Sequence, residues 1–193
     1  LPKIGSSSSP AATDLNGDGI KDIVIGGGAK EFSRTKTGVA AIDGANGQLI
    51  WAVPAHNQIV GSPVFQDINE DGIEDVFIGG RSAIFIAIDG KTGNKIWEFL
   101  PFDQNIDYVN DTSILNFFNP QWIQDIDEDG FLDLITAYGG FVKAQHGNEE
   151  RPAGYLMILS GRTGTKLAQT RMPDGKETYL SPIVHDFGQG AEV

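Results

Sequence analysis

Short apolar segments recur along the chain, and glycine, asparagine or aspartate is common in the turns between them. β-Branched and aromatic residues are common in these segments, and no segment shows sustained apolar spacing of the helical kind. Short runs of this type between turn-forming residues are typical of β-strands. The pattern predicts an all-β fold, and its clearest segments are 23–26, 38–43, 49–53, 76–79, 84–89, 95–99, 134–137 and 154–159.

The strand pattern repeats, and a common frame marks the start of each repeat. In each copy a Ser-Pro or Asn-Pro pair is followed by an aspartate four or five residues after the proline. These aspartates, Asp14, Asp67, Asp125 and Asp186, lie 53, 58 and 61 residues apart. About four short strands fall in each complete interval, which is the usual content of one blade of a β-propeller.

We therefore predict an all-β fold of the β-propeller class. The repeats are expected over residues 9–61, 62–118 and 119–180, with an incomplete fourth over 181–193. Propellers usually close with four to eight blades, so we expect residues 1–193 to be part of a larger propeller of about six to eight blades. A β-solenoid or a β-sandwich is the main alternative, and the long period argues against the solenoid.

Three acidic loops follow the first three copies of the frame and share the template Asp-x-Asn/Asp-x-Asp-Gly-x-x-Asp. In a tight loop, the side-chain oxygens at positions 1, 3 and 5 converge, glycine at position 6 permits the turn, and the position 7 carbonyl adds an oxygen. Such an all-oxygen shell suits Ca²⁺, so we expect about three calcium ions. The predicted ligands are Asp14, Asn16, Asp18, Ile20 and Asp22; Asp67, Asn69, Asp71, Ile73 and Asp75; and Asp125, Asp127, Asp129, Phe131 and Asp133.

The acidic template matches an EF-hand loop up to position 7 and then departs from it. An EF-hand has glutamate at position 12 and then a helix, whereas position 12 here is Ile25, Ile78 or Thr136. The fourth copy, from Asp186, lacks the second and third ligands and is assigned no metal. The third loop has aspartate where the other two have asparagine, so we expect it to bind calcium most tightly. The alternative is a set of metal-free turns, in which neighbouring carboxylates would repel by on the order of 1 kcal/mol per pair.

The composition excludes several classes of partner and site. The 193 residues include 26 acidic and 14 basic ones, for a net charge of -12, which disfavours nucleic acid as a partner. There is no cysteine, which excludes disulfides, thiolate metal sites and cysteine nucleophiles. No apolar run approaches the roughly 18 residues of a membrane-spanning helix. The chain begins at Leu1 without a signal peptide, so we expect a removed leader or a fragment of a longer protein.

The acidic loop, followed by a Val/Ile-rich strand, resembles the FG-GAP repeat of integrin-alpha-type propellers. The resemblance implies a loop that joins two strands of a blade and binds Ca²⁺ through the ligands named above.

A second motif, over residues 41–51 and 87–97, resembles the Ala-x-Asp-x-x-Thr-Gly-x-x-x-Trp docking motif of pyrroloquinoline-quinone-type (PQQ-like) propellers. This resemblance implies that Trp51 and Trp97 pack between neighbouring blades. The third copy has Ala168 at the tryptophan position, which weakens one blade contact and leaves the fold intact.

Catalytic chemistry has little support in the sequence. His56, His146 and His185 lie in different repeats without shared spacing, and Asp107 and Asp111 fall in one long polar loop that solvation explains better than catalysis. Quinoprotein enzymes hold their cofactor on the axis of a complete ring, often near a cysteine pair, and this chain has no cysteine. We therefore predict that the protein is not an enzyme.

Two insertions are candidates for recognition, because loops on a rigid scaffold commonly bind partners. One spans 103–118 and carries Tyr108, Phe117 and Phe118, and the other spans 142–152. The alternative for the aromatic residues is that they pack against the edge of the blade. We expect a calcium-stabilised, extracytoplasmic (secreted, cell-surface or periplasmic) module that binds a protein or a glycan, because millimolar calcium outside the cytoplasm fills even weak sites. The alternative is the propeller domain of a carbohydrate-active or quinone-dependent enzyme.

Overall fold

A computed structural model describes most of the chain as β-strands joined by turns. Within the described residues there is no helix, and accordingly none that is long and apolar enough to cross a membrane. The described residues are 5–28, 30, 33–81, 84–99, 115–141, 154–176, 181–186 and 191–192.

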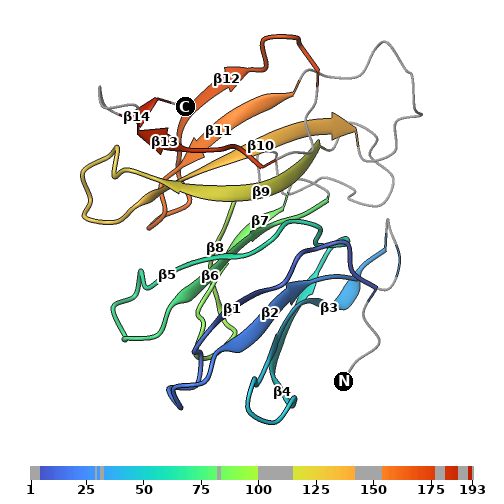
Figure 1. Cartoon of the computed structure of the whole chain (residues 1–193). Helices are drawn as coiled ribbons and strands as arrows, with labels where there is room; N and C mark the ends of the chain where they lie inside the picture. The colour runs from blue at the N-terminus through green and yellow to red at the C-terminus, as the bar shows by residue number, and fades with distance from the viewer. Residues whose placement is uncertain are drawn as a thin grey trace.

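The strands form three antiparallel four-stranded sheets and one two-stranded sheet, and strands that are consecutive in sequence lie side by side (Figure 1). This arrangement confirms the predicted all-β propeller class. The first sheet contains β1 (Ala11–Thr13), β2 (Asp22–Gly26), β3 (Thr35–Ile42) and β4 (Leu49–Ala55). The second contains β5 (Val64–Gln66), β6 (Asp75–Gly79), β7 (Phe85–Ile88) and β8 (Lys95–Phe99). The third contains β9 (Leu115–Ile123), β10 (Asp133–Phe141), β11 (Tyr155–Leu159) and β12 (Lys166–Arg171), and the small sheet pairs β13 (His185–Asp186) with β14 (Ala191–Glu192).

The second sheet lies between the other two, and its central strands β6 and β7 are buried along their whole length. Successive side chains of a strand point to opposite faces, so the sheet contributes to two cores. Phe77 and Phe85 pack with residues of the third sheet, whereas Val76 and Ile86 pack with residues of the first. Burial on both faces explains why these strands read as continuous apolar runs rather than alternating ones.

One expected recognition loop is corrected by the structure. Phe117 and Phe118 were assigned to an insertion, but both lie in β9 and are buried. Phe117 packs against Tyr138, with ring centroids 4.9 Å apart. These aromatic side chains therefore stabilise the core and are not available to a partner, while Tyr108 and the insertion over 142–152 lie outside the described residues.

Candidate metal centre

Each acidic loop joins the first two strands of its sheet. The strand pairing closes at Thr13 opposite Asp22, at Gln66 opposite Asp75, and at Ile123 opposite Asp133. The residue at position 9 is thus the first residue of β2, β6 or β10. The three loops therefore occupy equivalent places in the three sheets.

The aspartate at position 1 organises each loop, because both of its carboxylate oxygens accept backbone N–H groups of the same loop. In the first loop the N–H of Gly19 has the largest effect and lowers the pKa of Asp14. The distances from backbone nitrogen to carboxylate oxygen are 2.7 Å (Gly17) and 2.8 Å (Gly19) for Asp14 and 3.2 Å (Asp71) and 2.9 Å (Gly72) for Asp67. For Asp125 they are 3.1 Å (Asp129) and 2.8 Å (Gly130).

Side chains at positions 3 and 5 accept the N–H two residues further on, as in Asx turns. Position 3 does so at Asn16 (2.9 Å) and Asn69 (3.0 Å). At position 5 the acceptors are Asp18, Asp71 and Asp129, and the donors are the N–H groups of Ile20 (2.8 Å), Ile73 (3.0 Å) and Phe131 (3.0 Å). Ile20, Ile73 and Phe131 are the residues predicted to supply carbonyl ligands. The N–H group of each is therefore hydrogen-bonded to the predicted ligand two residues before it.

The backbone turns twice in the left-handed region in every loop. Glycine at position 6 has φ of 83°, 86° and 95° in the three loops, as the template requires. Position 4 also has positive φ, at Gly17 (77°), Glu70 (60°) and Glu128 (59°). The second turn was not predicted, although glycine at position 4 of the first loop was a signal for it.

The aspartate at position 9 has a structural role that the sequence did not reveal. Asp22, Asp75 and Asp133 are fully buried, and burial raises the pKa of Asp133 and raises that of Asp75 to about 6. One oxygen accepts the N–H of the second loop residue, at 2.8, 3.0 and 2.7 Å. The other accepts the N–H of a glycine in the next hairpin turn, namely Gly44 (2.9 Å), Gly90 (3.1 Å) and Gly161 (3.2 Å).

These three turn glycines fit tightly against the acidic loops. A Cβ atom at Gly44, Gly90 or Gly161 would lie 2.0, 2.0 or 2.1 Å from the carbonyl oxygen of the residue at position 8. No side chain is compatible with that separation. The hairpin turn and the acidic loop of each sheet are therefore one packed unit, held by the buried position 9 carboxylate.

The same turn glycines receive the docking tryptophans. Trp51 of the first sheet donates its indole N–H to the Gly90 carbonyl at 2.7 Å, and Trp97 of the second sheet donates to the Gly161 carbonyl at 3.1 Å. Contacts between neighbouring sheets through Trp51 and Trp97 are thereby confirmed. Ala168 replaces the third tryptophan and is exposed.

The third loop brings three predicted ligands together. Asp125, Asp127 and Asp133 each place one carboxylate oxygen within 4.8 Å of the others, the one group of three or more acidic, histidine or cysteine residues so placed in the described part of the chain. Asp129 is not in this group. In addition to burial, Asp127 and Asp125 raise the pKa of Asp133. A set of three carboxylate oxygens fits a hard cation such as Ca²⁺.

The first and second loops carry fewer acids at the same positions. Asn16 and Asn69 replace the position 3 aspartate, and the Asn69 amide donates to Asp75 at 3.3 Å. In the second loop, Lys91 Nζ also lies 3.4 Å from Asp71 Oδ2, so a cation already contacts one predicted ligand there.

The described histidines do not join this centre. Among the described histidines, His56 lines a cavity between the first two sheets, and His185 is exposed on β13. His146, Asp107 and Asp111 lie outside the described residues, and the structure does not describe the side chain of Asp186.

Solved structures with this fold include the following two. The chain superposes on the rhamnogalacturonan lyase YesW with a TM-score of 0.54 and 16% identity, covering 98% of this chain and 41% of the lyase. It superposes on a quinohemoprotein alcohol dehydrogenase from Comamonas testosteroni with a TM-score of 0.53 and 16% identity, covering 86% and 21% of the two chains. Likeness at this level of identity concerns the fold alone.

Sequence relatives define the family. Human Protein FAM234A is 28% identical over 172 residues, which cover 81% of this chain and 28% of that protein. Chicken Protein FAM234B is 24% identical over 196 residues, covering 92% and 28%. The chain thus spans less than a third of the length of either relative. Residues 11–192 match the family described as FAM234A/B beta-propeller, and the chain belongs to that family.

Proposed function

We propose that this chain is a calcium-stabilised, non-enzymatic propeller module that binds a protein or a glycan outside the cytoplasm. The observation that carries the calcium assignment is the group formed by Asp125, Asp127 and Asp133, within a loop geometry that recurs in all three sheets. Three carboxylates close together repel one another, and a divalent cation bound between them would remove that repulsion.

The loops have the character of structural metal sites. All predicted ligands of one ion come from a single loop of nine residues, and the position 9 carboxylate also holds the hairpin turn of its sheet. Calcium bound there would brace the loop against the turn. Such an ion stabilises the blade rather than activating a substrate, which supports a scaffold role and not a catalytic one.

The sequence relatives support the non-enzymatic part of this proposal. Human and chicken relatives are FAM234 proteins, and neither name describes an enzymatic activity. The two structural neighbours are enzymes by name, but they share only the fold with this chain. The proposed location outside the cytoplasm rests on the calcium proposal, because even weak calcium sites would fill at the roughly millimolar calcium concentrations found there.

Thermal unfolding in about 1 mM calcium and in excess chelator tests the proposal. Free calcium at about 100 times the Kd of one site adds roughly 2.7 kcal/mol to the free energy of unfolding. For a chain of this size, each kcal/mol raises the Tm by about 2–4 °C. We expect a calcium-dependent rise in Tm, and calorimetric titration to detect about three ions. An unchanged Tm together with no binding heat would overturn the calcium assignment.

Asp127→Ala is the sharpest variant, because Asp127 is exposed and belongs to the carboxylate group. We expect this variant to lose the contribution of the third ion while the protein stays folded. Glu128→Gln is the matched control, since Glu128 is an exposed acid in the same loop outside the predicted ligand set. An equal loss of calcium binding in both variants would point to general charge attraction instead of a defined site.

A further inference from the structure

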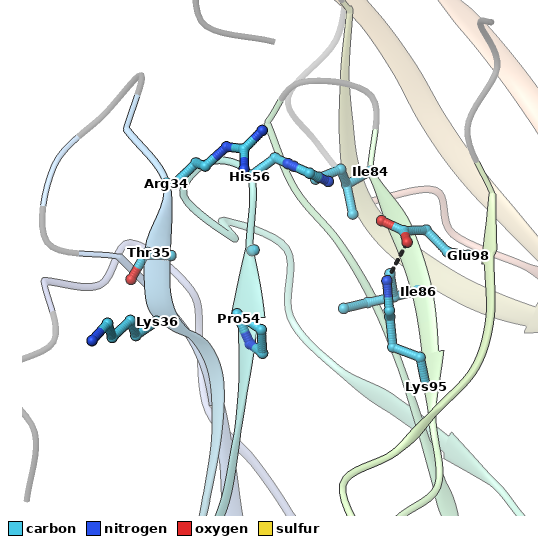
Figure 2. A pocket seen from close by; sticks show the side chains of 10 residues that line it. Arg34, Thr35, Lys36, Pro54, His56, Ile84, Ile86, Lys95 and Glu98 are labelled. Carbon is cyan, nitrogen blue, oxygen red and sulfur yellow. Dashed lines mark hydrogen bonds and ion pairs between the residues drawn. The ribbon is translucent and has the colours of Figure 1, made fainter. Parts of the chain in front are cut away.

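A cavity of about 490 Å³ lies between the first two sheets, away from the acidic loops. Its walls come from the start of β3, the end of β4, and strands β7 and β8 (Figure 2). Pro54, Ala55, Ile84 and Ile86 supply apolar walls, and the last two side chains are almost fully buried. The size and the apolar walls match those of small-molecule sites in other proteins.

The charge at this cavity is opposite to that of the chain. Arg34, Lys36 and Lys95 line it with a single carboxylate, Glu98, which leaves a net charge of +2 on a chain whose net charge is -12. Lys95 is paired with Glu98. Neither Arg34 nor Lys36 forms an ion pair with any residue that the structure describes. Within the described part of the chain, no carboxylate therefore competes with an anion for Arg34 or Lys36.

The placement of these groups defines where an anion would lie. In Figure 2 the guanidinium of Arg34 lies next to His56, and the His56 side chain extends across the gap toward Ile84 and Glu98 of the second sheet. Lys36 points away from His56 in the same view. Arg34 is thus the cation at the polar end of the cavity, with the apolar walls of Pro54 and Ile86 beyond it.

We propose that this cavity binds a small organic carboxylate, with the anionic group on Arg34 and an apolar body against Pro54, Ile84 and Ile86. A guanidinium presents paired N–H donors that match a carboxylate, and the isoleucine walls favour an apolar body over a hydrated anion. The site goes beyond the protein or glycan binding proposed above, and it does not depend on calcium, since it shares no residue with the acidic loops.

His56 adds a pH dependence to this site. Burial lowers the pKa of His56, Arg34 and Lys95 lower it further, and Glu98 raises it. The imidazole is therefore neutral at pH 7, and a bound carboxylate beside it favours the protonated form. Affinity should rise as pH falls through the pKa of His56, because the carboxyl group of the ligand, with a pKa of about 4.3 like that of glutamate, stays ionised.

Benzoate is a suitable probe, and titration of the ¹⁵N-labelled protein in saturating calcium measures its binding. We expect a Kd on the order of 1 mM, with amide shifts concentrated on β4, β7 and β8. Benzyl alcohol lacks the charge and sulfate lacks the apolar body, so both should bind at least about fivefold more weakly. Lowering the pH from about 7.5 to 5.5 should tighten benzoate binding, because a carboxylate bound beside His56 favours the protonated imidazole.

Arg34→Gln should weaken benzoate binding at least about fivefold without changing the Tm, because Arg34 is exposed. Lys166→Gln is the matched control on β12, outside the cavity, and should bind as the unaltered protein does. Equal binding by Arg34→Gln, or sulfate bound as tightly as benzoate, would overturn the proposal. Benzoate failing to bind while calcium still raises the Tm would reject this site and leave the calcium assignment standing.

Discussion

The junction between the first and second sheets and the junction between the second and third sheets share a framework but are filled differently. In the first junction Trp51 bonds to Gly90, and Thr13 donates to the Glu74 carboxylate. The second junction has the same two links one sheet later. Trp97 bonds to Gly161, Gln66 donates to the Leu132 carbonyl (3.3 Å), and the Leu132 N–H donates back to Gln66 (3.0 Å).

The cores of the two junctions differ in kind. The second is aromatic, with Phe77 4.9 Å from Trp122 and Phe85 5.8 Å from Phe117 between ring centroids. The first is filled mainly by valine and isoleucine, and it opens into the cavity of about 490 Å³. The repeated hydrogen bonds set how neighbouring sheets meet, whereas the size of the side chains decides whether the junction is solid or leaves room for a ligand.

The largest expected effect comes from truncating the core of each junction. Phe77→Ala should lower the free energy of unfolding by about 4 kcal/mol, because it removes a fully buried ring and leaves a void. Ile86→Ala should cost only about 2 kcal/mol, since Ile86 already borders a cavity. Denaturant unfolding of both variants in saturating calcium measures the difference. Equal losses would show that the two junctions are packed alike.

A smaller effect is expected where the tryptophan meets the turn. Gly93 has φ of 73°, and a Cβ atom there would lie 2.7 Å from Cγ of Trp51. Gly93→Ala should cost about 2–3 kcal/mol, of which roughly 1 kcal/mol is backbone strain and the rest is displacement of the indole. The measurement is Tm combined with tryptophan fluorescence, which should shift to longer wavelength.

The matched control for this variant is Gly47→Ala in the first sheet. Gly47 has φ of 72°, but a Cβ atom there would have nothing within 4 Å. Only the strain of about 1 kcal/mol should appear, with unchanged fluorescence. If both variants lost the same stability, the contact with Trp51 would contribute nothing.

The smallest expected effect concerns the side-chain links between neighbouring acidic loops. Thr13→Val should cost about 0.5 kcal/mol, because Glu74 is exposed and regains water. Gln66→Met should cost about 1 kcal/mol, since it removes two hydrogen bonds to Leu132. Denaturant midpoints, with Thr13→Val combined with Glu74→Gln in a double-mutant cycle, check the values. A larger loss for Thr13→Val than for Gln66→Met would reverse the comparison.

Much of the fold could be predicted from sequence, because the signals are local. The acidic template, the apolar runs and the turn glycines each lie within about ten residues, and their repetition indicated a propeller. β9 was the exception, because Asn116 and Asn119 gave its N-terminal half the look of a polar loop. Phe117 between them is nevertheless fully buried.

The candidate sites were predictable only in part, for the same reason. The acids of one loop are neighbours in sequence, so the approach of Asp125 and Asp127 was expected, whereas the third member of the group is Asp133 and not the position 5 acid, Asp129. The bond from Asp22 to Gly44 spans 22 residues, and no local pattern indicates it. The cavity beside Arg34 draws its walls from two sheets, so its charge and shape arise only once those sheets are packed together.

Gly90 links two sheets through a single residue. Its N–H donates to Asp75 in its own sheet, and its carbonyl accepts from Trp51 in the preceding sheet; Gly161 does the same for Asp133 and Trp97. Each of these glycines therefore joins the acidic loop of its own sheet to the outer strand of the sheet before it. If the third loop binds calcium as proposed, loss of that ion would weaken the loop itself and also the contact of Gly161 with Trp97 of the second sheet.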